Sequence, residues 1–137
     1  NGHGTPWYFS KKVIDIITRL QPGPHDQFPV RFVDKRDGKD YGVHYAFYLP
    51  TYLDCIDVDL TQFNAGYGIE AARRSGFGLR IGGKKPYVLK KKSIAGWHIW
   101  RATRENASLT FISDELHDQL RASGAEGWTY LRCDLID

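Results

Sequence analysis

Three aspartates, Asp54, Asp57 and Asp59, are the first residues of this 137-residue chain whose type and spacing could do chemistry. Asp57 and Asp59 alternate with apolar residues, so a strand would place both carboxylates on one face. Paired carboxylates can hold a divalent cation or divide general acid and base roles between them. The same alternation is typical of the polar side of a half-buried strand. We favour this second interpretation, and an enzyme that uses these aspartates stays the alternative.

The five histidines and two cysteines lack the spacing of metal ligands. No pair follows HxH, HxxxH or CxxC, the patterns that bring two ligands onto one face of an element. His44 and His98 lie in strand patterns, and we interpret them as an aromatic contact across a sheet. Cys55 and Cys133 lie in apolar-alternating runs and are interpreted as buried thiols, with a disulfide as the alternative. The sequence thus predicts no catalytic residue, no metal site and no cofactor.

Residues 76–83, "GFGLRIGG", are rich in glycine and lie beside basic residues. They match neither GxGxxG nor GxxxxGK[ST], and no helix start follows that would supply anion-binding amides. We therefore predict a loop here and no phosphate site.

The basic segment, residues 73–92, is the strongest candidate for a binding surface. Tyr67, Phe77 and Tyr87 accompany its cations, and this composition is typical of surfaces that bind phosphates and stack bases. A cationic surface fits an acidic protein partner equally well, and lysines at a strand edge also block unwanted strand pairing. All of these interpretations stay open. The cations of the basic segment are Arg73, Arg74, Arg80, Lys84, Lys85, Lys90, Lys91 and Lys92.

The stretch "GWHIWRA" places Trp97 and Trp100 on opposite sides of an expected strand. One would be part of the core, and the other would be an exposed anchor of the sort that dominates protein interfaces. The alternation does not decide which is which. Trp97 and Trp100 therefore join the cations of the basic segment as candidate partner-binding residues.

The elements that must position these residues begin with a helix. Ser10 is a typical N-cap, and apolar residues recur from Val13 to Leu20 at helical spacing before "QPGPHD" ends the helix. Residues 28–34 and 41–49 alternate on either side of a turn at Asp37-Gly38, which predicts a β-hairpin. Further strand candidates are 52–60, 86–93, 97–103 and 109–112.

Two parts of the chain, 7–34 and 109–134, repeat one order of residue types: aromatic, apolar, Ser, apolar-periodic stretch, Gly-containing break, aromatic-led alternation, Asp. Alignment of Ser10 with Ser113 predicts a second helix, whose matched face includes the polar residues Gln119 and Ser123. The fold class predicted is α+β: a mostly antiparallel sheet with two packed helices from two similar strand–helix–strand units.

Length and composition fit one soluble globular domain with a net charge of +3. No run approaches the ~18 apolar residues of a membrane span and no signal peptide is recognisable, so we expect a cytoplasmic location and no membrane partner. The chain has no Met, and residues 1–6 are expected to be a disordered or vector-derived start of a processed or truncated chain. Residues 7–137 would form a single domain with a Gly-rich, basic insertion at about 64–85.

The second half of the chain resembles an immunity-protein family of bacterial polymorphic-toxin systems, first described as an uncharacterised family expanded in myxobacteria. The earlier stretches "YFSKKVIDIITRL", "FPVRFVD" and "YGVHYAFYL" are similar to the preceding part of that family. The 64–85 insertion, and the absence of an N-terminal segment that full-length members carry, depart from its pattern. The residues that carry the resemblance are Ile94, Gly96, Ile99, Trp100, Arg101, Phe111, Ile112, Ser113, Asp114, Gly127 and Trp128.

The resemblance implies a non-catalytic, cytoplasmic α+β inhibitor that binds and neutralises a cognate protein toxin. An inhibitor needs only a complementary surface, which agrees with the absence of a recognisable catalytic motif. A nucleic-acid-binding module that uses the basic segment is the alternative function. The sequence identifies neither the toxin nor the oligomeric state.

Overall fold

The computed structural model describes residues 6–57, 60, 87–102, 110–130 and 132–137. The chain folds into two compact units. The first unit combines Asn1–Thr51 with Ile112–Glu126, and the second combines Tyr52–Phe111 with Gly127–Asp137. The single domain expected for 7–137 stays a prediction.

The first unit contains a three-stranded sheet of order β1-β3-β2. Both pairs of neighbours are antiparallel, and β2 and β3 form the hairpin that the sequence predicts. Gly38 has a φ of 73° in the turn, a conformation that glycine adopts without strain. The backbone N–H of Lys39 donates to Asp37 Oδ1 at 2.8 Å, which fixes the turn. The strands are β1 (Trp7–Phe9), β2 (Asp26–Val33) and β3 (Asp40–Tyr48).

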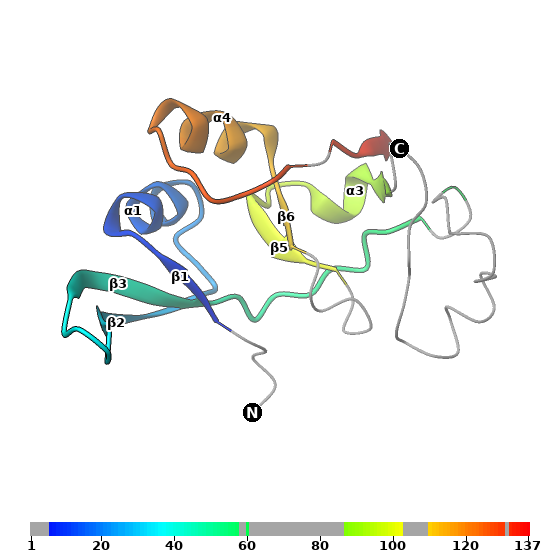
Figure 1. Ribbon diagram of the computed structural model, residues 1–137. Coiled ribbons are helices and arrows are strands. Elements are labelled where there is room, and N and C mark those ends of the chain that lie inside the picture. Colours follow the sequence, from blue (N-terminus) through cyan, green and yellow to red (C-terminus); the bar gives the residue numbers. More distant parts are fainter. Residues whose placement is uncertain (1–5, 58–59, 61–86, 103–109, 131) are drawn as a thin grey trace, which may run out of the picture. The chain divides into compact units, whose positions relative to one another are not determined.

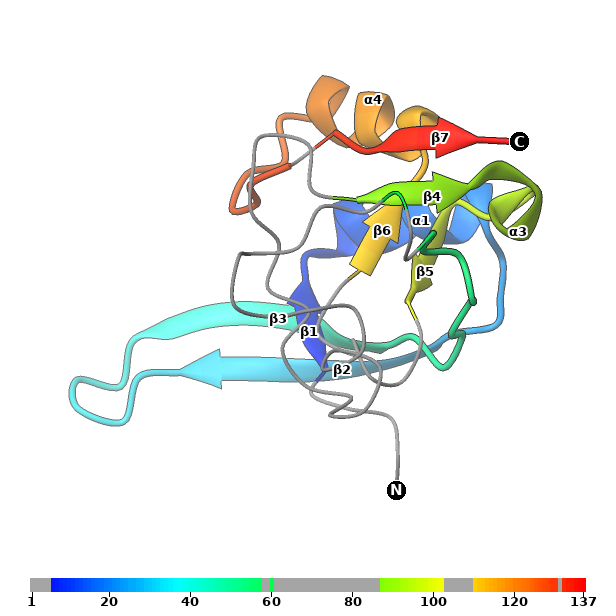
Figure 2. The same ribbon diagram turned by 90° about the vertical axis from the view of Figure 1, so that its right-hand side faces the viewer.

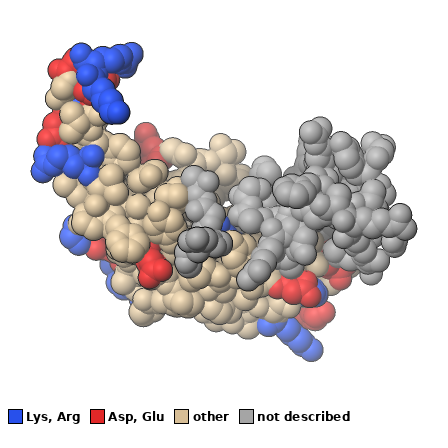
Figure 3. All heavy atoms as spheres, turned by 90° about the horizontal axis from the view of Figure 1, so that it is seen from below, with Lys and Arg blue, Asp and Glu red and all other residues tan. Residues whose placement is uncertain are grey.

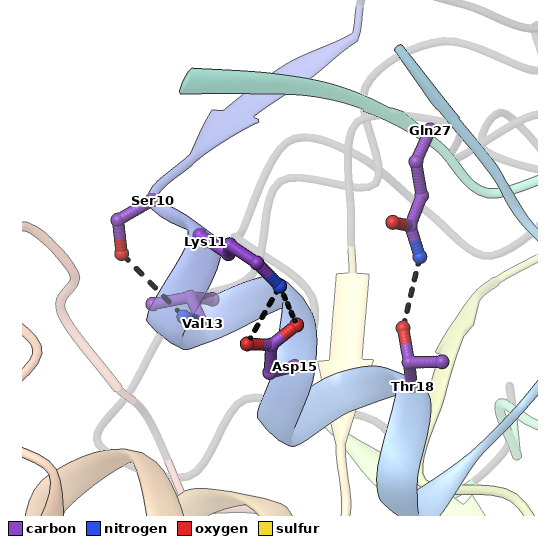
Figure 4. A network of polar contacts seen from close by, with 6 residues as sticks. All are labelled: Ser10, Lys11, Val13, Asp15, Thr18 and Gln27. Atoms are coloured by element: carbon purple, nitrogen blue, oxygen red, sulfur yellow. Dashed lines mark hydrogen bonds and ion pairs between the residues drawn. The ribbon is translucent and has the colours of Figure 1, made fainter. Parts of the chain in front are cut away.

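Two helices complete this unit, α1 (Lys11–Leu20) and α4 (Asp114–Ala122). Ser10 caps α1 by accepting from the N–H of Val13 at 3.4 Å (Figure 4), and Ser113 caps α4 by accepting from Leu116 at 3.1 Å. Each serine directly follows a strand, β1 in one copy and β6 (Thr110–Ile112) in the other. The repeat therefore has a physical meaning, because the same strand–cap–helix start occurs twice.

The two helices lie side by side (Figure 1). Gln119 and Ser123, the polar residues on the matched face of α4, serve this contact. Arg19 of α1 donates to Gln119 Oε1 at 2.7 Å, and Lys12 Nζ donates to the carbonyl of Ser123 at 2.8 Å. These bonds are exposed, so each contributes little to stability; the Gln119 side chain makes one of them, whereas Ser123, just past the end of α4, contributes only its backbone carbonyl to the other.

The helix caps provide a first test of the repeat. Replacement of Ser10 or Ser113 by alanine is expected to lower the free energy of unfolding by about 1 kcal/mol, because one N–H of the first turn loses its acceptor. The glycine variants at the same positions should cost only a few tenths of a kcal/mol. Urea denaturation of the four variants measures this. Equal losses for alanine and glycine would show that the hydroxyls do not act as caps.

The second copy differs from the prediction after α4. No strand forms over 128–130 and 132–133; the return strand is β7 (Asp134–Ile136), which pairs in parallel with β4 (Val88–Lys90) (Figure 2). In the first copy, β2 is held by β3, its hairpin neighbour. The strand β7 pairs instead with a strand from earlier in the chain, and that pairing begins only at Asp134. The strands that flank the two helices therefore belong to different sheets, and the α+β class with an antiparallel main sheet is confirmed.

The second unit is built from short strands around one apolar cluster. β5 (Ile99–Arg101) pairs with β6, and the strand expected over 52–60 is represented in its described part by isolated bridges, Tyr52 to Arg101 and Ile56 to Leu89. The strand expected over 86–93 ends at Lys90, where the short helix α3 (Lys91–Ile94) begins. The buried members of the cluster are Cys55, Ile56, Leu89, Trp100, Ala102 and Phe111.

Candidate partner-binding surfaces

The basic segment is described only in part. Arg73, Arg74, Arg80, Lys84 and Lys85 lie outside the described residues, as does the Gly-rich stretch 76–83. Its described cations, Lys90, Lys91 and Lys92, occupy the junction between β4 and α3.

Lys90 is partly committed to a structural contact. Its Nζ lies 3.3 Å from Asp54 Oδ1, and the Asp54 side chain is 81% exposed. An ion pair with so exposed a partner contributes little to stability. The backbone N–H of Lys90 also donates to the carbonyl of Cys55 at 2.7 Å, which anchors β4 to the apolar cluster. We therefore assign Lys90 mainly to the scaffold.

Lys91 and Lys92 are exposed and form the first turn of α3. Cations there oppose the helix dipole, and the N-cap, Lys90, makes no side-chain bond. Exposed cations that the fold does not need are available to a partner, so Lys91 and Lys92 are the part of the basic segment that remains a candidate contact.

The two tryptophans differ in exposure. Trp100 is 2% exposed, and its ring stacks on Phe111 with centroids 6.0 Å apart and planes at 16°. Trp97 is half-buried and packs against the same apolar cluster. Its backbone N–H donates to the carbonyl of Ile94 at 3.1 Å. Trp100 is thus the core residue of the pair, and its side chain is not available to a partner. Trp97 presents only part of its surface.

The residues that could do chemistry have structural contacts instead. Asp57 Oδ1 accepts from the N–H of Leu60 at 2.9 Å, Asp54 pairs with Lys90, and Asp59 lies outside the described residues. His44 belongs to β3 in the first unit, whereas His98 precedes β5 in the second, so they do not pair across one sheet. In the described ranges no three His, Cys, Asp or Glu side chains are grouped closely enough to hold a metal ion.

Cys55 and Cys133 are free thiols that pack into one apolar cluster. Burial raises the pKa of Cys133 to about 11, and it also raises the pKa of Cys55. Both groups are therefore protonated near neutral pH, and a protonated thiol is a poor nucleophile. Of the two predicted buried thiols, Cys55 is buried and Cys133 is half-buried, and neither lies in a strand.

The sequence analysis missed one surface, on the side of the β1-β3-β2 sheet that faces away from α1. Residues opposite one another in the register share a face, so Tyr8, Ala46 and Phe28 form one row on this side. The other side carries Phe9 and Phe47, which are buried with α1. We define the outer sheet face as Tyr8, Phe28, Val30, Phe32, His44 and Tyr48, with Ala46 beneath them.

The rings of the outer sheet face contact one another. The centroids of Tyr8 and Phe32 are 5.1 Å apart, those of Phe32 and His44 are 5.3 Å apart, and those of Phe28 and Tyr48 are 6.0 Å apart. Tyr8 is nevertheless 50% exposed and Phe28 is 54% exposed. The surface is therefore largely apolar, with the exposed Asp26 at its margin opposite Tyr48, and it is ordered by its own contacts and open to solvent. The alternation in 28–34 contains this signal, but it does not say which row is buried.

One protein family matches the chain. The model of the immunity protein family Imm11 matches residues 2–134. Because the match covers nearly the whole chain, the protein belongs to this immunity protein family. No curated protein and no solved structure gave a significant match to the chain. None of the described helices is long and apolar enough to cross a membrane.

Proposed function

We propose that this protein is a cytoplasmic, non-catalytic inhibitor that binds one cognate bacterial toxin and so protects the producing cell. The observation that carries the proposal is the match of the immunity protein family over residues 2–134. A compact scaffold with an apolar face and a separate cationic turn supports it, because inhibition by binding requires surface complementarity rather than a reactive group.

The proposed role of the basic segment is electrostatic. Exposed cations raise the rate of association with a negatively charged partner, and rim charges act on this rate more than on the lifetime of the complex. Lys91 and Lys92 would attract an acidic toxin toward this protein. The half-buried Trp97 follows α3 by three residues and would contact the toxin with its exposed part.

A paired toxicity assay tests the function. The reading frame adjacent to this one is expressed in a test bacterium alone and together with this protein, and survivors are counted. Killing by the neighbour and rescue by this protein are the expected results. If the neighbour kills despite co-expression of the full-length protein, the proposed function is wrong for this pair.

Reversal of the charges of Lys91 and Lys92 is expected to slow association with the toxin. For the double variant Lys91→Glu/Lys92→Glu, we expect the association rate at low salt to fall about tenfold, with the dissociation rate nearly unchanged. The neutral variant Lys91→Gln/Lys92→Gln is the matched control, and the logarithm of its association rate should fall by about half as much. Stopped-flow kinetics at two salt concentrations measures both variants.

The difference between these variants should shrink at high salt, because exposed charges are screened beyond about 8–10 Å at physiological ionic strength. Equal association rates for wild type and both variants at low salt would remove the basic turn from the interface. Steeply salt-dependent binding of the wild type to DNA or RNA, without rescue from a toxin, would instead favour the nucleic-acid-binding alternative.

A further inference from the structure

The strand β2 presents its apolar row to solvent and its more polar row to the helix side. Phe28, Val30 and Phe32 lie on the outer sheet face, whereas Gln27 points toward α1 and donates to Thr18 Oγ1 at 2.9 Å (Figure 4). A shift of one residue in register would exchange the two rows. A chain without a partner would gain more stability by burying the apolar row of β2. The observed orientation of the two rows therefore indicates that the apolar row contacts a molecule outside the unit.

We propose that the outer sheet face is the surface on which the cognate toxin docks, through an apolar patch of the toxin. This inference rests on the proposed function and adds the location and chemistry of the contact. Aromatic residues are enriched in the cores of protein interfaces, where they contribute much of the binding energy. Tyr8 and Phe28 are the exposed aromatic residues of this face, and ring contacts with Phe32 and Tyr48 hold them in place before binding.

The exposed area favours a toxin over a second copy of this chain. An aromatic side chain has roughly 150–250 Å² of surface, so the two half-exposed rings and their partly buried neighbours together offer roughly 300 Å². Pairing of this face with itself would bury about 600 Å² in total, which is below the ~1,200 Å² of a stable interface. A different protein can extend the contact past the face onto the hairpin, and the apolar patch would then be the centre of a normal interface.

Several charged residues of the hairpin lie in or near its turn, whereas Asp26 lies at the start of β2, on the outer sheet face opposite Tyr48. Arg36 pairs with Asp34 at 3.1 Å and Arg31 pairs with Asp40 at 2.5 Å, so these charges are largely compensated within the hairpin. Figure 3 shows Lys and Arg side chains together with Asp and Glu side chains at the end of the projecting arm, and a mostly uncharged surface with scattered charged side chains below it. An uncharged centre with a polar border is the usual composition of a protein interface.

The edge of β2 is less suited to a partner than its face. In the observed register Pro29, which belongs to the edge strand β2, lies opposite Tyr45; proline is tolerated in an edge strand when its nitrogen, which has no N–H, faces away from the neighbouring strand. A strand added at that edge would lose a donor near the middle of β2. Proline at an edge strand is a known obstacle to strand addition. Docking therefore uses the side chains of the face.

Variants of the two exposed aromatic residues test the inference. We expect Tyr8→Lys and Phe28→Lys each to weaken toxin binding on the order of 10- to 100-fold and to abolish rescue when combined. Leu135→Lys is the matched control, because Leu135 is 53% exposed but belongs to β7 in the second unit. It should bind and rescue like the wild type. Calorimetry with purified toxin measures affinity, and circular dichroism with thermal melting shows that each variant is folded.

The outcomes separate this inference from the proposed function. If the wild type fails to bind or rescue, the proposed function fails. If the wild type rescues and folded Tyr8→Lys and Phe28→Lys variants bind as tightly as the control, only the docking face is wrong. If the wild type forms a dimer, and the variants lose dimerisation but keep toxin binding, the face belongs to a contact with a second copy and the inference is overturned. Tighter binding by Pro29→Ala would assign the contact to the edge of β2 instead.

Discussion

Replacement of Phe47 by alanine is expected to lower the free energy of unfolding by about 3–5 kcal/mol, a large part of the stability of a small protein. Phe47 is 1% exposed on the helix side of the β1-β3-β2 sheet. Its ring lies 5.5 Å from that of Phe9 and 5.1 Å from that of His25. Removal of the ring leaves a cavity between the sheet and α1 that rigid neighbours fill only in part.

Phe28→Ala is the matched control, because it removes the same side chain from the opposite face of the same sheet. Phe28 is 54% exposed, so its loss should cost about 1 kcal/mol or less. Urea denaturation followed by circular dichroism gives both values. Costs of similar size for the two variants would mean that the outer sheet face is part of a core, and the docking inference would then lose its basis.

Local signals in the sequence predict much of the first unit. The alternation on either side of Asp37-Gly38 is sufficient for the hairpin, because the turn type and the strand period agree. Ser10 and Ser113 mark both helix starts, since a serine before an apolar-periodic run satisfies an N–H that the helix cannot. These elements depend on contacts between residues close in sequence, which is why pattern reasoning finds them.

The second unit follows from contacts that the pattern does not contain. Its strands β4 and β7 pair although Val88 and Asp134 are far apart in the chain, and the expected strand over 52–60 is reduced, in its described residues, to single bridges such as Ile56 with Leu89. Short strands of this kind have little local preference of their own. The sequence also predicts a strand through the three lysines at 90–92, but α3 begins at Lys91. Two cations at the start of a helix oppose its dipole, so local preference does not predict this helix.

The candidate surfaces show the same division. Alternation predicts one buried and one exposed tryptophan, whereas Trp97 precedes β5 and packs half-buried against the same apolar cluster that buries Trp100. Alternation also identifies an apolar row in β2, but it does not say whether Phe28 lies in the core or in solvent. The face that a strand buries is decided by the whole sheet: β3 carries Phe47 toward α1, and the register then turns Phe28 outward. A sequence pattern gives the two rows of a strand, and the sheet assigns them to core or solvent.

Replacement of Trp100 by alanine is the corresponding test of the second unit, and we expect it to cost about 3–5 kcal/mol. Trp100 is 2% exposed and stacks on Phe111, and the cluster around it includes Cys55 and Leu89. Loss of this side chain removes the largest member of the cluster. Any loss of rescue in Trp100→Ala would therefore follow from unfolding, whereas a binding anchor would lose toxin affinity and keep its stability.

Two variants separate these possibilities. Trp100→Phe keeps a ring that can stack on Phe111, and it should recover most of the lost stability together with rescue. Trp97→Ala removes the half-buried neighbour and should cost about 1–2 kcal/mol, because only part of its ring is withdrawn from water. Urea denaturation and toxin affinity are measured on the same preparations. If Trp100→Ala is as stable as the wild type but binds the toxin more weakly, Trp100 is an anchor and the apolar cluster does not depend on it. If Trp100→Ala loses stability and Trp100→Phe restores it, the second unit is a scaffold organised around Trp100.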